Sequence, residues 1–108
     1  MADITELTED NFQAEVLQSS QPFLVDFWAP WCGPCLRVAP VVEQLAAENA
    51  GTARFGKVNV DSNQNLAVSY GVNSIPTLIV FKDGQVARSF VGLQPKDRLQ
   101  QALDDDAG

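Results

Sequence analysis

The sequence contains no histidine, 2 cysteines and only 7 lysines and arginines among its 108 residues. Without histidine there is no imidazole general base or imidazole metal ligand, and two cysteines cannot complete a four-cysteine zinc or iron–sulfur site. The 14 acidic residues give a formal net charge of −7. Clustered positive charge, which nucleic-acid phosphates and anionic membranes require, is therefore missing, and we expect neither kind of partner.

Long hydrophobic runs are absent as well. No apolar stretch approaches the roughly 18 residues of a transmembrane helix, and residues 1–6 lack the positive charge and apolar core of a secretory leader. We therefore expect a cytoplasmic protein, with an organellar stroma or matrix, reached after removal of a transit peptide, as the alternative. The length is that of one domain, which we expect to span residues 1–108.

Hydrophobic patterning and turn residues predict the order βαβαβαββα along the chain. Strands are expected at 4–7, 23–28, 54–60, 77–81 and 86–91, and helices at 8–20, 34–49, 63–70 and from Pro95 onward. The segment Lys82-Asp83-Gly84-Gln85 has the Asp-Gly signature of a hairpin. This alternation predicts an α/β fold, with a parallel core sheet, an antiparallel edge and helices on both faces.

The two cysteines occur in the motif Cys32-Gly33-Pro34-Cys35, between a strand and the helix that follows it. A structural disulfide is one interpretation, but closing a four-residue loop stabilises a fold by only about 2 kcal/mol, against about 4.7 for a hundred-residue loop. A metal site shared by two chains and a chance pair of buried thiols are two further interpretations. The strand-to-helix position favours a redox pair.

A helix N-terminus gives the two cysteines different chemistry. Unpaired N–H groups and the helix dipole are expected to lower the pKa of the Cys32 thiol, whereas Cys35 lies one turn further in and is expected to be more buried. Cys32 would then attack a substrate disulfide, and Cys35 would resolve the mixed disulfide. Gly33 permits a tight turn, and Pro34 suits the first helical turn.

Asp26 is the only charged residue in the apolar run 23–28. Burial there is expected to raise the pKa of its carboxyl group, which would suit a proton acceptor for Cys35. The alternative is an edge strand or a bulge, where the carboxylate reaches water. Lys57, in the next predicted strand, is a candidate partner, although single lysines in strands usually face solvent.

Two long windows of the sequence contain no acidic residue. One lies between Asp26 and Glu43 and includes Trp31, and the other runs from residue 66 to residue 82 and includes Ile75-Pro76. Neutral apolar surface of this kind suits the docking of protein substrates.

The segment Trp28-Ala29-Pro30-Trp31-Cys32-Gly33-Pro34-Cys35 resembles the active-site motif of the thioredoxin family. Further residues stand where that family has them, and the resemblance spans nearly the whole chain: Asp26, Pro40, Lys57, Ile75-Pro76-Thr77, Gly84 and Gly92. It implies a thioredoxin fold, in which a central mixed sheet of about five strands is flanked on both faces by four helices.

The resemblance also implies an activity and its residues. The activity is that of a protein-disulfide reductase and electron carrier, with Cys32 as nucleophile, Cys35 as resolving thiol, and Asp26 and Lys57 as a buried tuning pair. It implies a cis Ile75–Pro76 bond and a docking groove rimmed by Trp31, Gly33, Pro34, Ile75, Pro76 and Gly92.

The cofactors and partners that the resemblance implies fit a redox carrier. No cofactor would be bound beyond the redox-active Cys32–Cys35 disulfide, and electrons would come from NADPH or ferredoxin through a separate thioredoxin reductase. The substrates would be disulfide-containing proteins, and the chain would be a monomer active in cell redox homeostasis. The Gly33-Pro34 pair resembles the reducing branch of the family more than its oxidant and isomerase branches.

One position departs from the family pattern. Leu36 stands where many members carry a basic residue, and Arg37 follows it. A shift of one position rotates the charge by about 100° around a helix. Two other functions remain open at this stage: disulfide formation or isomerisation, and a non-catalytic binding subunit in which the motif is incidental.

Overall fold

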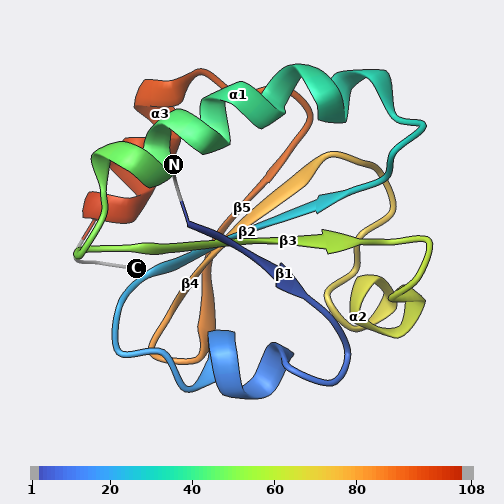
Figure 1. Cartoon of the computed structure of the whole chain (residues 1–108), viewed down its shortest axis with the longest axis horizontal. Coiled ribbons are helices and arrows are strands. Elements are labelled where there is room, and N and C mark those ends of the chain that lie inside the picture. The colour runs from blue at the N-terminus through green and yellow to red at the C-terminus, as the bar shows by residue number, and fades with distance from the viewer. Residues whose placement is uncertain (1–2, 106–108) are drawn as a thin grey trace.

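The computed structural model describes residues 3–105, which form five strands and four helices in the expected order. In chain order these are β1 (Ile4–Leu7), η1 (Gln13–Leu17), β2 (Phe23–Trp28), α1 (Gly33–Glu48), β3 (Arg54–Asn59), α2 (Gln64–Ser69), β4 (Thr77–Lys82), β5 (Gln85–Val91) and α3 (Lys96–Asp104) (Figure 1). Within this part of the chain, no helix has the length and apolar character needed to cross a bilayer.

The sheet has the strand order β1-β3-β2-β4-β5 and is mixed, as the resemblance implied. β1, β3 and β2 are parallel, but β4 runs antiparallel to β2 and β5 antiparallel to β4. The sequence pattern alone placed β4 in the parallel core, which is wrong. The six residues of α2 span about 9 Å, less than half the roughly 20 Å of a six-residue strand. The chain therefore stays at one end of the sheet, and β4 runs back from there.

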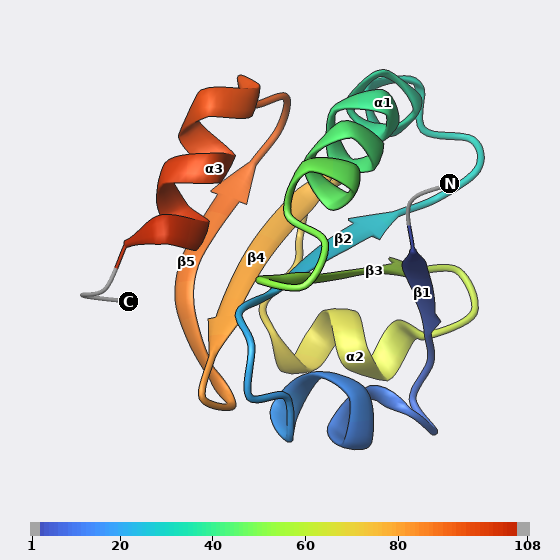
Figure 2. The ribbon, with the colours of Figure 1, turned by 60° about the vertical axis from the view of Figure 1, so that its left-hand side comes forward.

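Helices cover both faces of the sheet, as expected (Figure 2). On one face, α1 and α3 pack against the sheet through residues that include Val38, Leu45 and Leu99. On the other face, the segment of η1 contributes Phe12 and Val16, and the aromatic ring of Tyr70 follows α2. β2 lies between β3 and β4 and is buried along its length except at Trp28.

Side chains of β2 and β3 alternate between these two faces. Leu24 packs in the α1 and α3 layer, whereas Phe23, Val25 and Phe27 pack in the opposite layer. Because residues two apart in a strand share a face, Asp26 points to the same side as Leu24. The face that holds Asp26 is therefore the face covered by α1.

The first helix is shorter than the sequence pattern predicted. Residues 9–11 form a turn, in which the Thr8 carbonyl accepts hydrogen bonds from the N–H groups of Asn11 and Phe12, and η1 covers only Gln13–Leu17. It has wide π-type turns, since the N–H of Gln18 bonds to the carbonyl of Gln13 at 3.1 Å.

The turns fall where the sequence predicts them. Asp83 and Gly84 both have positive φ, 53° and 77°, which matches the two-residue hairpin expected between β4 and β5. Gly51, with φ 87°, follows the C-terminal end of α1. Pro95 is the N-cap of α3, whose Leu99, Ala102 and Leu103 are buried as expected.

Candidate functional site

Cys32 and Cys35 form a disulfide at the start of α1, with their Cα atoms 5.2 Å apart. Cys32 is the N-cap residue of the helix, and its Sγ accepts a hydrogen bond from the backbone N–H of Cys35 at 3.1 Å. Pro34 is the second residue of the helix, within its first turn. The sulfur of Cys32 therefore lies among the unpaired N–H groups of a helix N-terminus, as the sequence predicts, which favours a negative charge there.

Two segments far apart in the sequence meet at the disulfide. Cys32 and Cys35 pack with Ala29, and Ile75 contacts this cluster. The Sγ of Cys32 lies 3.8 Å from the carbonyl oxygen of Ile75, which precedes Pro76 in a cis peptide bond, as the resemblance implied.

Gly92 is brought to the same place by the end of β5. Its N–H donates to the carbonyl of Pro76 at 2.9 Å, and it has a φ of 88°. A Cβ added to Gly92 or to Gly33 would meet no atom within 4 Å, so the space beside both residues is open. In residues 3–105, neither the N–H nor the carbonyl of Ile75 makes a backbone hydrogen bond.

Trp31 is 70% exposed, yet its indole is held by a carboxylate. Its Nε1 donates to both oxygens of Asp61, at 3.0 and 3.3 Å. Nothing in the sequence pairs these residues, which lie 30 positions apart. One signal does place Asp61 nearby: it follows β3, whose carboxyl end lies beside that of its parallel neighbour β2. The sequence window around Trp31 contains no acidic residue, but the fold places the carboxylate of Asp61 beside it.

Asp26 is buried, with 1% of its surface exposed, and its Oδ1 has no hydrogen-bond partner among the described residues. Burial raises the pKa of its carboxyl group to about 6, and the charge of Lys57 opposes this rise. Asp26 pairs with Lys57 on one side and Leu78 on the other, in regular register. The expected rise in pKa is confirmed, and the alternative of an edge strand or bulge is wrong.

Lys57 lies on the same face of the sheet as Asp26 but is only half-buried. Its ammonium group lies 4.2 Å from the centre of the Trp28 ring, a cation–π contact. No ion pair within 4 Å joins Lys57 to Asp26 in the described chain. A hollow of about 250 Å³ adjoins it, lined by Ile4, Thr5, Glu6, Trp28, Lys57 and Asn59.

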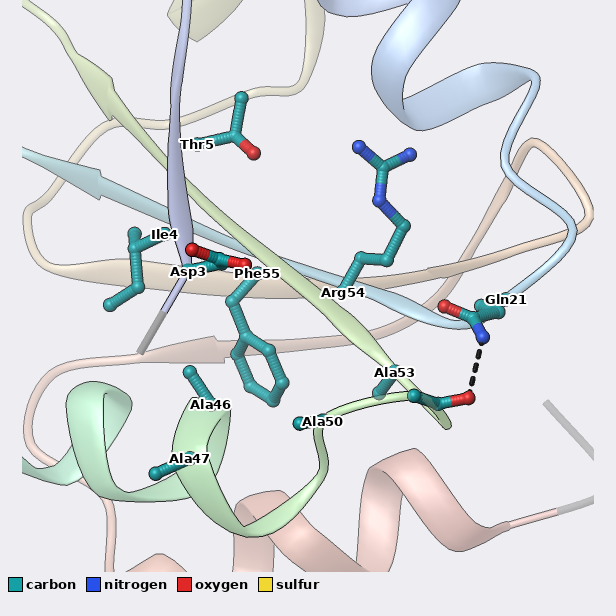
Figure 3. Close-up of a pocket in the computed structure, with 11 residues that line it drawn as sticks. Asp3, Ile4, Thr5, Gln21, Ala46, Ala47, Ala50, Ala53, Arg54 and Phe55 are labelled. Atoms are coloured by element: carbon teal, nitrogen blue, oxygen red, sulfur yellow. Dashed lines mark hydrogen bonds between the residues drawn. The ribbon is translucent and has the colours of Figure 1, made fainter. Parts of the chain in front are cut away.

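A larger cavity, of about 550 Å³, lies at the other end of α1 (Figure 3). Its lining includes Gln21, Ala46, Arg54 and Phe55, and Gln21 donates to the Gly51 carbonyl at 2.7 Å. The 16 residues of α1 extend about 24 Å, and the disulfide lies at the opposite end. This cavity contains no cysteine and takes no part in the chemistry of the sulfurs.

The described residues contain no group of three or more cysteine, aspartate or glutamate side chains placed to hold a metal ion. What the site offers is a pair of sulfurs that interconvert between a disulfide and two thiols, at a helix N-terminus on a mixed five-stranded sheet. The fold and the site together define a thiol–disulfide oxidoreductase.

Comparison with known proteins agrees with this class. A family model described as Thioredoxin matches residues 3–105. Thioredoxin 2 of Chlorobaculum tepidum is 48% identical over 103 residues, which cover 95% of this chain and 94% of that protein. Thioredoxin 1 of Synechococcus elongatus is 52% identical over 98 residues, covering 91% of this chain and 92% of that protein. Thioredoxin M4, chloroplastic, of Arabidopsis thaliana is 42% identical over 102 residues, covering 94% of this chain and 53% of that protein.

The chain belongs to the thioredoxin family. Its Cys32–Cys35 pair is the redox-active disulfide of a protein-disulfide oxidoreductase. A non-catalytic binding subunit, the alternative left open by the sequence, is not favoured.

Proposed function

We propose that the chain reduces protein disulfides, with Cys32 as the nucleophile and Cys35 as the resolving thiol. The observation that carries this assignment is the N-cap position of Cys32, whose Sγ accepts the N–H of Cys35 at 3.1 Å. A thiolate on Cys32 would keep that hydrogen bond and gain from the helix dipole. Cys35 lies within the first turn of α1 and is not the N-cap residue, so its sulfur lacks this stabilisation.

The reaction is two successive exchanges. The Cys32 thiolate attacks one sulfur of the substrate disulfide, the substrate S–S bond breaks, and the released thiolate takes up a proton. Deprotonated Cys35 then attacks the Cys32 sulfur, which restores the Cys32–Cys35 bond and releases the second substrate thiolate, also to be protonated. The substrate gains two electrons and two protons, and the dithiol of this chain supplies them.

Asp26 is proposed as the acceptor of the proton that Cys35 loses. Its side chain lies on the sheet face covered by α1, the helix whose first turn contains Cys35. A pKa of about 6 keeps the carboxylate available near neutral pH while making it more basic than an ordinary aspartate. Lys57 is proposed to limit that rise, because its charge favours the ionised form.

The proposed docking groove surrounds the disulfide and is formed by Trp31, Gly33, Pro34, Ile75, Pro76 and Gly92. An extended substrate segment can pair with the N–H and carbonyl of Ile75, which make no backbone hydrogen bond among the described residues, as a strand adds to the edge of a sheet. The open space beside Gly33 and Gly92 leaves room for that segment to approach the sulfurs.

We propose that a thioredoxin reductase returns electrons to the Cys32–Cys35 disulfide, drawing them from NADPH or from ferredoxin. On this proposal residues 1–108 act as one monomeric domain in electron transport and cell redox homeostasis. A cytoplasmic location is proposed, because a dithiol reductant needs a compartment that keeps thiols reduced. A plastid stroma is the alternative, since one similar protein is named as chloroplastic.

A Cys35→Ser variant tests the assignment of the two sulfurs. It should accumulate a mixed disulfide between Cys32 and a substrate such as insulin, because the second exchange is blocked. Mass spectrometry of the non-reduced adduct locates the bond. The matched Cys32→Ser variant should trap little or nothing, and the reverse pattern would exchange the two roles.

Insulin reduction with NADPH and a thioredoxin reductase, or with a ferredoxin-dependent reductase, tests the direction of the reaction. Turnover with at least one of them is expected. Equilibration with glutathione then distinguishes a reductase from an oxidase by the reduction potential of the Cys32–Cys35 pair. Each 29.6 mV of difference in potential changes the equilibrium constant for exchange with glutathione tenfold. A potential in the oxidising range, or full partner binding by a protein with both cysteines changed to serine, would count against the proposal.

A further inference from the structure

Trp31 combines high exposure with a fixed orientation. An indole that is 70% exposed has little packing to hold it, yet both oxygens of Asp61 accept from its Nε1. These are charge-assisted hydrogen bonds, which are stronger than bonds between neutral groups. Trp31 immediately precedes Cys32. Its hydrogen bonds to Asp61 therefore fix the orientation of the indole ring next to the reactive sulfur.

Asp61 is itself held in place by the loop between β3 and α2. Its own N–H donates to Oδ1 of Asn59 at 2.9 Å, and the neighbouring Val60 donates its N–H to the carbonyl of Trp28 at 2.9 Å. The buried Asn63 closes the loop by donating to the Asn59 carbonyl at 3.1 Å. The loop therefore holds the backbone of Asp61, from which the exposed carboxylate reaches the Trp31 indole.

We propose that Asp61 is a positioning residue for substrate docking, which holds the Trp31 indole in its binding orientation before a substrate arrives. This proposal rests on the proposed function, because it concerns how a protein disulfide docks beside Cys32. A side chain already held in place loses little freedom when a partner contacts it, so the cost of ordering it does not reduce the affinity. Removal of the carboxylate should weaken docking of protein substrates and leave the sulfur exchange itself in place.

The test is steady-state insulin reduction by Asp61→Ala and Asp61→Asn, coupled to an excess of thioredoxin reductase. Asp61→Ala should raise the KM for insulin by about two- to tenfold, the range expected when one side chain must be ordered on binding. The kcat should change far less than the KM. Asp61→Asn keeps an oxygen that accepts from the indole N–H, and it should restore most of the lost affinity.

A double-mutant cycle with Trp31→Phe decides whether Asp61 acts through the indole. Phenylalanine has no N–H, so Asp61→Ala should have no further effect on the KM in that background. The indole N–H resonance of Trp31, assigned by its loss in Trp31→Phe, should shift in Asp61→Ala and remain closer to its original position in Asp61→Asn. A merely structural role would lower stability without this pattern.

A matched control is Asp10→Ala, which removes one exposed carboxylate that makes no hydrogen bond in the described chain. It should leave the KM for insulin unchanged. If Asp61→Ala raised the KM equally in the wild type and in the Trp31→Phe background, the proposal would be overturned, since Asp61 would then act on the substrate directly. An unchanged KM in Asp61→Ala would overturn it as well. Failure of the wild-type protein to reduce insulin would instead overturn the proposed function, and this proposal with it.

Discussion

Asp26 and Lys57 are direct neighbours in the parallel pairing of β2 with β3, yet the Lys57 ammonium lies against the Trp28 ring, 4.2 Å from its centre. The carboxylate is left with one oxygen that has no hydrogen-bond partner among residues 3–105. A lysine in direct contact would hold the pKa of Asp26 low, whereas burial here raises it to about 6. The protein thus carries a buried group that changes charge close to neutral pH.

Replacing Asp26 with alanine should stabilise the oxidised protein at pH 7.5. The pKa of Asp26 rises from 3.8 to about 6 on folding. At a pH above both of these pKa values, the ionised carboxylate therefore lowers the folding stability by about 3 kcal/mol. The cavity left by Asp26→Ala offsets about 1 kcal/mol of the gain. Urea unfolding should therefore show a net increase of about 1–2 kcal/mol.

The pH dependence gives the same prediction a second readout. Between about pH 4 and pH 6 the folded protein keeps the proton on Asp26 and the unfolded chain loses it, so stability falls as the pH rises through this range. Asp26→Ala should lack that fall, whereas Asp10→Ala, which removes an exposed acid, should keep it. Equal stability of wild type and Asp26→Ala at pH 7.5 would show that water reaches the carboxylate.

Lys57→Met should raise the pKa of Asp26 above about 6, because the charge of Lys57 is what opposes the effect of burial. The range over which stability falls with increasing pH should then extend to higher pH than in the wild type. NMR titration of the Asp26 carboxyl carbon measures this directly. Lys57→Arg, which keeps the charge, is the control, and an unchanged titration in Lys57→Met would mean that the charge of Lys57 is screened from Asp26.

Much of the fold follows from local pattern, because it depends on residues close together in the chain. The apolar run 23–28 forms the central strand, the Asp83-Gly84 turn forms the hairpin, and Cys32 caps the helix as its neighbours indicate. The direction of β4 does not follow from local pattern. It depends on how far the connection through α2 carries the chain, and on the sheet end at which Pro76 leads into the strand.

The site shows the same division between local and long-range information. The motif from Trp28 to Cys35 predicts the position and the chemistry of the sulfurs. The burial of Asp26 follows from its apolar neighbours, but the direction of the Lys57 side chain towards Trp28 is decided by packing across strands. The bond between Asp61 and Trp31 joins two loops 30 residues apart, and only the assembled sheet brings them together.

Gly84→Ala should destabilise the protein more than Gly51→Ala does. Both glycines have positive φ, 77° and 87°, which costs an alanine about 1–2 kcal/mol. A Cβ on Gly84 would also lie 2.8 Å from the carbonyl oxygen of Leu17, whereas one on Gly51 would meet nothing within 4 Å. The difference between the two variants in urea unfolding therefore measures the contact between the hairpin and η1, and we expect about 1 kcal/mol or more. Equal losses would show that η1 moves away without cost.

Leu36→Lys should change which disulfides the protein prefers. Leu36 is 54% exposed in the first turn of α1, directly after Cys35, and its N–H bonds to the Cys32 carbonyl at 3.2 Å. A positive charge there would attract acidic segments that flank a substrate disulfide. For an acidic disulfide peptide, we expect kcat/KM to rise about two- to fivefold at low ionic strength and to return towards the wild-type value at about 0.5 M salt. A neutral peptide of the same length should gain less.

Val86→Lys separates this local effect from a change in net charge. Val86 is 49% exposed and pairs with Phe81 near the hairpin, whereas Val91, at the other end of the seven-residue β5, pairs with Thr77 beside the site. Val86 lies about 17 Å along the strand from Val91 and hence from the site, which is beyond the screening length of about 8 Å in physiological salt. Val86→Lys should therefore leave the peptide preference unchanged. An equal gain for acidic and neutral peptides in Leu36→Lys would mean that the lysine acts on the Cys32 thiolate, and not on the substrate.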